Sequence, residues 1–284
     1  MAARLAGRER SAALCALWRA IETSSRSPLV ADPFAADIAK ELLGREGVEK
    51  LSKATFAASL QYLVALRTRL IDDALGDWIR LRQQSVGKLP QVVQLAAGCD
   101  TRVLRLPLDA VRGVRFFEVD TPRVADFRRD LVSAAAARRQ EPLSAEQLGF
   151  DLRQPEGLLE ALQARGLDPH APTAWVCEGL LEYHPPAFGK RLLKTITGAH
   201  PVQAEGKNAV NSGNLLVLAV LDRSWLDFLR KQHSQQPVRM AWREDQLPPV
   251  ETIVKLLREL GWNRVDVASE FRLPPADAQP SPAE

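Results

Sequence analysis

The stretch from Gln91 to Asp120 constrains the fold more than any other part of the sequence. Gln91–Arg102, QVVQLAAGCDTR, joins a short apolar run to a turn of small residues, and Val114–Asp120, VRFFEVD, is a second apolar run that ends in an acid. Gly98 and Asp120 are 22 positions apart (120 − 98), close to the spacing of about 20 in one β-turn-α-β unit. Small residues let the backbone approach a ligand, and an acid that closes the next strand can bind two ribose hydroxyls. The pair therefore predicts a site for a nucleoside-containing cofactor.

The chain after Pro90 alternates between segments of strand and helix character. Strands are expected at 91–96, 114–119, 173–177 and 214–221, with a weaker one near 146–150 and a last one over 263–271. Helices are expected near 122–138, 155–165, 187–198, 225–233 and 249–260, and a loop over 199–213. Such alternation predicts an α/β fold with a doubly wound, mostly parallel, Rossmann-like sheet and helices on both faces.

The first ninety residues have helical character throughout. We expect one amphipathic helix over 8–24, and a second that starts at Asp32-Pro33, with Asp32 as the N-cap and Pro33 at the first helical position. A third helical region is expected from about Val48 to Ser85, with a break near Gly76. We therefore divide the chain into an N-terminal helical cap (1–88), a core (89–272) and a Pro/Ala-rich disordered tail (273–284).

Composition excludes several classes of function. The net charge of +3 is spread along the chain and aromatic residues make up 6%, which gives no support for nucleic-acid binding. No run approaches the ~18 apolar residues of a membrane span. The three cysteines form no CxxC pair, so we expect neither zinc nor disulfides, and a reducing compartment. We expect a cytoplasmic monomer or homodimer, although the Arg/Ala-rich start leaves organellar targeting open.

Four expected strand ends carry groups that suit a nucleoside ligand. They are Ala96-Ala97-Gly98, Glu118 with Asp120, Asp151-Leu152, and Glu178-Gly179. Ligands of open parallel sheets bind beyond the carboxyl ends of the strands, so these groups should converge.

The turn after the first strand indicates which cofactor is bound. The third glycine of G-x-G-x-x-G is absent, and Asp100 in the loop would repel a pyrophosphate; no GxxxxGK[ST] occurs either. S-adenosylmethionine has no phosphate, and it carries a positive sulfonium and a positive amino group that acids suit. The loop therefore favours S-adenosylmethionine over a dinucleotide.

Several segments together resemble the leucine carboxyl methyltransferase family of S-adenosylmethionine-dependent methyltransferases, which includes bacterial and plant members of unassigned substrate. The matching segments, in family order and spacing over roughly residues 10–200, are RTRLIDD from Arg67, VVQLAAGCDTRVLRL, FFEVDTP, FDLR and PTAWVCEGLLEYHPP. The later WREDQLPPVETIVKLLRELGW is similar more loosely. Two departures are Ala96, where the family usually has glycine, and an end soon after Phe271, where relatives run on through a final strand.

The resemblance implies a role for each of seven cofactor-binding residues. Arg67 would pair with the carboxylate of the cofactor, Ala96 and Gly98 would line its methionine part, Asp120 would hold the ribose, Asp151 and Leu152 would contact the adenine, and Glu178 would face the amino-acid end.

The methyl acceptor is the second half of the expected chemistry. A carboxylate acceptor is already ionised, whereas an alcohol or phenol needs a general base. Tyr183 and His184 follow the fourth strand where an acceptor could approach, and they are the candidate catalytic residues. Arg102 either orients an anionic acceptor or forms a salt bridge within the fold.

We therefore expect an O-methyltransferase that acts on a carboxylate or hydroxyl of a small molecule or of a protein C-terminus. Two alternatives stay open. One is a catalytically inactive binding protein of the same fold. The other is an NAD(P)-dependent oxidoreductase, which the missing glycine and Asp100 disfavour.

Overall fold

The protein is described here by a computed structural model. It describes residues 7–54, 57–84, 88–107, 111–139, 145–199, 213–220, 249–262 and 265–267. The expected helix at 225–233 and the tail at 273–284 lie outside these residues, as do most of the expected loop at 199–213 and of the strand at 263–271. The described part of that strand, residues 265–267, is not in a strand.

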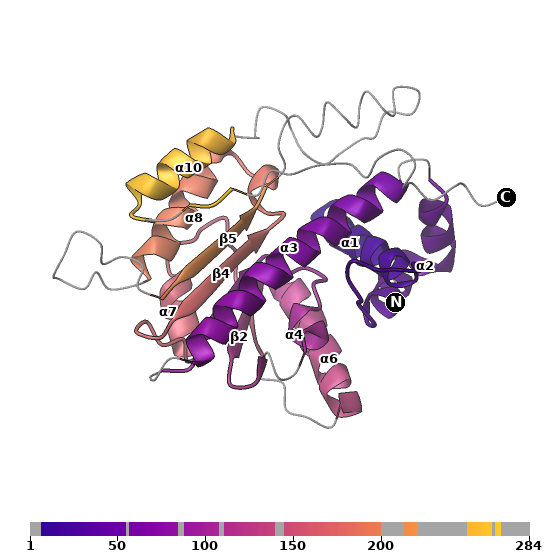
Figure 1. The fold of residues 1–284 in the computed structure, drawn as a ribbon, viewed down its shortest axis with the longest axis horizontal. Coiled ribbons are helices and arrows are strands. Elements are labelled where there is room, and N and C mark those ends of the chain that lie inside the picture. The colour runs from indigo at the N-terminus through magenta and orange to yellow at the C-terminus, as the bar shows by residue number, and fades with distance from the viewer. Residues whose placement is uncertain are drawn as a thin grey trace.

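A five-stranded parallel sheet forms the centre of the described structure (Figure 1). Its strands are β1 (Gln91–Leu95), β2 (Arg115–Asp120), β3 (Ala145–Gly149), β4 (Thr173–Glu178) and β5 (Leu215–Ala219). The strand order is β3-β2-β1-β4-β5, so the direction of winding reverses between β1 and β4. In such sheets the reversal opens a crevice at the carboxyl ends of the strands. The expected parallel α/β fold is confirmed.

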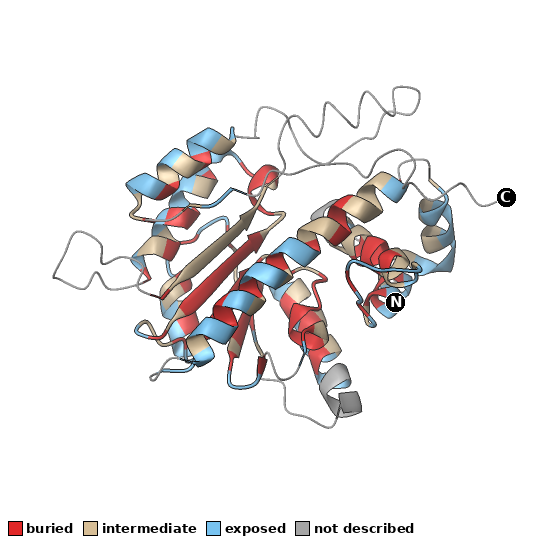
Figure 2. Cartoon of the chain, in the orientation of Figure 1, coloured by how far each residue is buried: buried red, intermediate tan, exposed pale blue. Residues whose placement is uncertain are grey.

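Helices cover both faces of the sheet, and its central strands are buried between them (Figure 2). Successive side chains of a strand point to opposite faces, so each strand contributes to the apolar layer on either side of the sheet. Val93 and Trp175 pack with α7 (Leu158–Ala164), α8 (Pro186–Gly198) and α10 (Val250–Glu259). Val92 and Val176 pack on the opposite face, which α3 (Ala57–Gln83), α4 (Arg102–Arg105) and α6 (Pro122–Arg139) cover. The central strand β1 is buried along its whole length as a result.

The N-terminal helices lie beyond the carboxyl end of the sheet. α1 (Gly7–Thr23) packs against α2 (Ala35–Ser52) and α3. Leu17, Trp18, Ile38 and Val64 from these helices form a separate apolar cluster that includes Cys99 of the loop after β1. This cluster joins the helices to the loop on which the expected ligand site depends.

The helix boundaries differ from expectation at two places. The second helix begins at Ala35 with Phe34 as its N-cap, so the placement of Asp32 as N-cap and of Pro33 at the first helical position is wrong. Asp32 still stabilises the turn before the helix, because its Oδ1 accepts the N–H groups of Phe34 and Ala35, both at 3.1 Å. The expected break at Gly76 is wrong, because α3 is continuous there and the break falls between Ser52 and Ala57. The buried neighbours Leu75 and Ile79 pack on the sheet, and this packing outweighs the low helix propensity of glycine.

Candidate functional site

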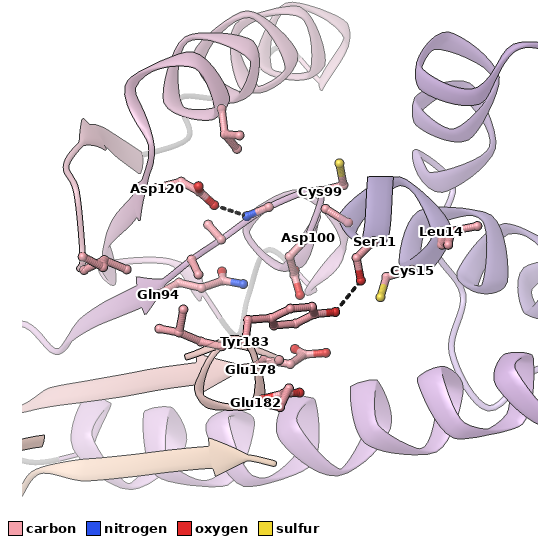
Figure 3. A pocket seen from close by; sticks show the side chains of 18 of the residues that line it. Ser11, Leu14, Cys15, Gln94, Cys99, Asp100, Asp120, Glu178, Glu182 and Tyr183 are labelled. Atoms are coloured by element: carbon pink, nitrogen blue, oxygen red, sulfur yellow. Dashed lines mark hydrogen bonds between the residues drawn. The ribbon is translucent and has the colours of Figure 1, made fainter. Parts of the chain in front are cut away.

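A cavity of about 440 Å³ lies beyond the carboxyl ends of β1, β2 and β4, between these strands and helices α1 and α3 (Figure 3). Its volume falls within the range of small-molecule sites, about 300–1,000 Å³. All nine candidate residues line it: Arg67, Ala96, Gly98, Asp120, Asp151, Leu152, Glu178, Tyr183 and His184. The structure thus brings together residues that are up to 117 positions apart in the sequence (184 − 67).

The turn after β1 has an unusual backbone. Ala96 (φ 53°) and Gly98 (φ 52°) both lie in the left-handed region, and Ala96 is the only non-glycine residue with positive φ in the described part of the chain. A left-handed L-residue costs roughly 1–2 kcal/mol, so this position favours glycine. A side chain at Gly98 would also bring its Cβ to 3.2 Å from Cβ of Ala12 in α1. The two residues let the loop pass close under α1.

Asp120 at the end of β2 holds this turn in place. Its Oδ2 accepts the N–H of Gly98 at 2.8 Å, and its Oδ1 accepts the N–H of Thr121 at 2.7 Å (Figure 3). Burial raises the pKa of Asp120, and the two backbone N–H groups partly oppose that rise. Each carboxylate oxygen has a further lone pair that can accept a hydroxyl proton. The arrangement suits a pair of neighbouring ribose hydroxyls.

Arg67 of α3 and Glu178 at the end of β4 form an ion pair on the opposite side of the cavity. Nε of Arg67 lies 2.7 Å from Oε1 of Glu178, and Nη2 of Arg67 lies 3.6 Å from Sγ of Cys15. Burial alone would raise the pKa of Glu178, but the guanidinium groups of Arg67 and Arg102 outweigh burial and hold the pKa below its ordinary value. Glu178 is therefore ionised at neutral pH, and it fixes the direction of Arg67.

Arg102 forms salt bridges within the fold and does not line the cavity. Its side chain is 1% exposed, and its nitrogens lie 2.6 Å from Asp72, 2.8 Å from Asp100 and 3.1 Å from Glu178. Of the two alternatives for Arg102, the structural one describes it. Asp100 also contacts Arg105 at 3.3 Å, and the nearby arginines hold its pKa well below the ordinary value against the effect of burial. Because Arg102 and Arg105 compensate its charge, Asp100 repels a phosphate group less strongly than its place in the loop predicts.

Two more buried arginines, which the sequence did not indicate, bind the loop after β1. Arg19 donates to the carbonyl oxygen of Cys99 at 2.6 Å and to Asp32 at 2.8 Å. Arg128 donates to the carbonyl oxygens of Gly98 at 3.0 Å and Asp100 at 2.6 Å.

Glu118, an expected strand-end acid, belongs to this structural network. Its carboxylate forms an ion pair with Arg128 and accepts a hydrogen bond from Nε2 of Gln147 at 2.5 Å. Glu118 does not line the cavity. Among the two acids of β2, only Asp120 can therefore contact a ligand there.

The two candidate catalytic residues lie on or beside the 3-10 turn η1 (Leu181–Tyr183). Tyr183 forms a hydrogen bond between its hydroxyl and Oγ of Ser11 at 2.6 Å, which closes the turn onto α1 (Figure 3). His184 is stacked on Phe188 with ring centroids 3.9 Å apart. The histidine also interacts electrostatically with Asp151, so it lies toward the β3 side of the cavity.

Asp151 lies at the open side of the cavity. Its side chain is 44% exposed and pairs with Arg153 at 2.6 Å. Hydrogen bonds from Arg153 lower the pKa of Asp151 to about 2, so the side chain is ionised. Leu152 beside it is buried, which gives the pair the polar and apolar character expected of an adenine contact.

Glu182 lines the cavity, although the sequence analysis did not single it out. It is 2% exposed, its Oε2 has no hydrogen-bond partner, and burial raises its pKa to about 7. A signal was present, because Glu182 stands among apolar residues in LLEY.

No group of three potential metal ligands gathers anywhere in the described residues. Among the described helices, none has the length and apolar character needed to cross a membrane.

The sequence model of leucine carboxyl methyltransferases matches residues 12–197. A protein of Mycolicibacterium paratuberculosis (strain ATCC BAA-968 / K-10), provisionally named an S-adenosyl-L-methionine-dependent methyltransferase, is 33% identical over 196 residues, covering 66% of this chain and 61% of that protein. A protein of Mycobacterium sp. (strain JLS) with the same provisional name is 35% identical over 200 residues, again covering 66% and 61%. The chain thus spans 61% of the length of these curated relatives.

A crystal structure from Thermobifida fusca YX, provisionally described as a methyltransferase, superimposes with a TM-score of 0.51 at 17% identity. The match covers 87% of this chain and 78% of that one. At this level of identity the likeness concerns the fold alone.

Proposed function

The chain belongs to the leucine carboxyl methyltransferase family, and from this membership we propose that it binds S-adenosylmethionine and transfers the methyl group to an oxygen atom. The acceptor would be a carboxylate or hydroxyl of a small molecule or of a protein C-terminus. One observation carries the proposal: the nine residues expected from the sequence converge on one cavity at the point where the strand order reverses. The names of the two mycobacterial relatives agree with it.

The ion pair between Arg67 and Glu178 suits the amino-acid end of the cofactor. That end is a zwitterion, so its carboxylate can bind the Arg67 guanidinium while its ammonium binds Glu178. Both protein charges are already mostly buried, with side chains 20% and 10% exposed, and they face each other in the free protein. Binding therefore exchanges one ion pair for two, without the cost of burying a new unpaired protein charge.

The other contacts would fix the rest of the cofactor. Asp120 would accept the ribose hydroxyls on the lone pairs that its bonds to Gly98 and Thr121 leave free. Asp151 and Leu152 would contact the adenine, with the carboxylate accepting the exocyclic amine. The left-handed turn at Ala96 and Gly98 would let the backbone lie against the methionine chain.

When bound, the cofactor would supply an electrophilic methyl group on a positive sulfur. The protein would mainly align an acceptor oxygen in line with the breaking S–C bond. Helices α1 and α3 and the Tyr183–Ser11 bond cover one side of the cavity, and this cover would limit the access of water to the reacting groups from that side.

Ligand binding tests the proposal directly. Titration with S-adenosylhomocysteine should quench tryptophan fluorescence saturably, because Trp18 lines the cavity, and NADH should have no such effect. A saturable response to NADH together with none to S-adenosylhomocysteine would favour the oxidoreductase. Binding of S-adenosylhomocysteine without transfer to any acceptor would identify the inactive relative.

A further inference from the structure

The carboxylate of Glu182 is the one buried acid of the cavity wall that has an oxygen without a partner in the described residues. Its Oε2 has no hydrogen bond, although the residue is only 2% exposed. A buried carboxylate oxygen left without a hydrogen bond is costly, which makes it unusual outside a functional site. The neighbouring acids are all compensated: Glu178 by Arg67 and Arg102, and Asp120 by two backbone N–H groups.

The position of Glu182 separates it from the two catalytic candidates next to it. His184 interacts with Asp151, at the end assigned to the adenine. Glu182 interacts electrostatically with Arg67 and Glu178, at the end assigned to the methionine, and Figure 3 shows Glu182 and Glu178 next to each other. The methyl group would stand at the methionine end. The hydroxyl of Tyr183 is bound to Oγ of Ser11, whereas Oε2 of Glu182 has no hydrogen bond. Of the three consecutive residues, Glu182 is therefore the one whose acceptor atom is available to an acceptor's proton there.

The charges that line the cavity restrict the class of acceptor. Five carboxylates and three arginines line it among the described residues, and each arginine is bound to a carboxylate. Arg67 is the arginine assigned to the cofactor's own carboxylate. Of the other two, Arg19 is 2% exposed and already bound to Asp32 and to the carbonyl oxygen of Cys99. Arg153 pairs with Asp151 at the end assigned to the adenine, away from the methyl group, so neither is placed to bind a second, anionic carboxylate there.

We propose, on the basis of the function proposed above, that the methyl acceptor is a neutral hydroxyl compound, an alcohol or a phenol, and that Glu182 is the base that takes its proton. As the acceptor oxygen bonds to the methyl carbon, the S–C bond breaks and its electron pair stays on sulfur. The hydroxyl proton goes to Oε2 of Glu182 and leaves to water after product release. The products are a methyl ether, S-adenosylhomocysteine and one proton.

The titration of Glu182 fits this role. Burial raises its pKa to about 7, while a hydrogen bond from its own backbone N–H and the charge of Arg67 on α3 lower it and Glu178 on β4 raises it. Cys177 of β4 also interacts electrostatically with it, and Cys15 of α1 contacts Arg67 on the facing side. A base whose pKa lies near the working pH combines a useful ionised fraction with a strong driving force for proton transfer.

Matched acceptors test the substrate class. Labelled S-adenosylmethionine is offered with 4-butylphenol and 4-butylbenzoate, and with octanol and octanoate, at pH 8. The hydroxyl member of each pair should be methylated at least tenfold faster. If turnover is too slow to measure, the same compounds are titrated into the S-adenosylhomocysteine complex, where the hydroxyl member should bind at least tenfold more tightly. The proposal would be overturned if the hydroxyl and carboxylate compounds were methylated at equal rates or bound equally well, or if neither bound. A preference for the carboxylates would overturn it as well.

Glu182→Gln tests the residue, with Glu46→Gln on the exposed surface of α2 as the matched control. The first variant should lose about 10²-fold or more in kcat with the hydroxyl acceptor and should lose the limb of the pH–rate profile near pH 7. Its affinity for S-adenosylhomocysteine should stay within about twofold, and the control should match the wild type. Unchanged kcat would overturn the proposal, and so would a tenfold loss of S-adenosylhomocysteine affinity, which would instead assign Glu182 to the cofactor's ammonium. Failure of the wild type to bind S-adenosylhomocysteine would reject the proposed function itself.

Discussion

The two ends of the cavity use the same chemistry, an arginine beside a carboxylate, in opposite ways. At the methionine end, Arg102 is buried and binds Glu178, which also binds Arg67, and the side chains of Glu178 and Arg67 are only 10% and 20% exposed. At the adenine end, Asp151 and Arg153 form an exposed pair, with side chains 44% and 69% exposed. Buried charges hold one another because leaving one unpaired is costly, whereas exposed pairs are screened by water. The methionine end is therefore preorganised, and the adenine end is free to adapt.

The largest effect should come from breaking the buried network. Arg102→Met would leave Asp72, Asp100 and Glu178 without their shared partner, so we expect a loss of about 3–5 kcal/mol in the free energy of unfolding, measured by urea denaturation. Asp151→Asn at the other end should change the same quantity by no more than about 0.5 kcal/mol. Similar losses in the two variants would contradict the comparison.

The pH dependence of the free energy of unfolding should show how much the buried, ionised carboxylate of Glu182 destabilises the fold. The pKa of its carboxyl rises from 4.5 to about 7 on folding, so the folded protein holds this proton more tightly than the unfolded chain does. The free energy of unfolding should therefore fall as the pH rises from about 4.5 to 7, by up to about 3 kcal/mol from this group.

Glu182→Gln removes that loss, and it should raise Tm at pH 8 while leaving Tm at pH 4.5 nearly unchanged. The raised pKa of Asp120 contributes with the same sign and is retained in the variant. If Tm of the variant at pH 8 equals that of the wild type, the ionised carboxylate does not destabilise the folded state.

Loss of Asp120 should weaken cofactor binding more than loss of the exposed Asp151. Asp120→Ala removes a carboxylate that binds both the Gly98 N–H and, as proposed, the ribose, so binding of S-adenosylhomocysteine should weaken by about 1–3 kcal/mol. Asp151→Ala, at the exposed end, should weaken binding less. Calorimetric titration of both variants at one pH measures the difference, and the reverse order would contradict the assignment of the two ends.

The smallest effect concerns the turn between the two ends. Ala96→Gly removes the strain of a left-handed alanine, but it also increases the entropy of the unfolded chain. We expect a net gain of about 0.5 kcal/mol in the free energy of unfolding by urea denaturation. A loss larger than about 1 kcal/mol would mean that the Ala96 methyl makes packing contacts that outweigh the strain.

The local pattern of the sequence predicts the sheet and the lining of the cavity. Buried parallel strands appear as short apolar runs, and the residues that follow them meet at one edge, so the sequence alone indicates Gly98, Asp120 and Glu178 as neighbours in a site. The departure at Ala96 has a physical consequence as well, since the turn needs a positive φ at that position.

Long-range pairing cannot be read from the sequence. Arg102 and Arg128 are two of several arginines near the loop, and nothing local marks their partners Glu178 and Glu118, which tertiary packing selects. The break expected at Gly76 is wrong because propensity is local, while the buried neighbours of Gly76 on α3 decide the outcome. The apolar neighbours of Glu182 in LLEY are visible in the sequence, but the absence of a hydrogen-bond partner for its Oε2 is visible only in three dimensions.

A crystal structure of the protein with S-adenosylhomocysteine tests the central claim most directly. We predict that the ribose hydroxyls lie within hydrogen-bond distance of Asp120, and that the ligand carboxylate binds Arg67, which leaves Glu178 for the ligand's ammonium. A nucleoside bound elsewhere, or a ligand whose carboxylate and ammonium contact neither Arg67 nor Glu178, would contradict the account.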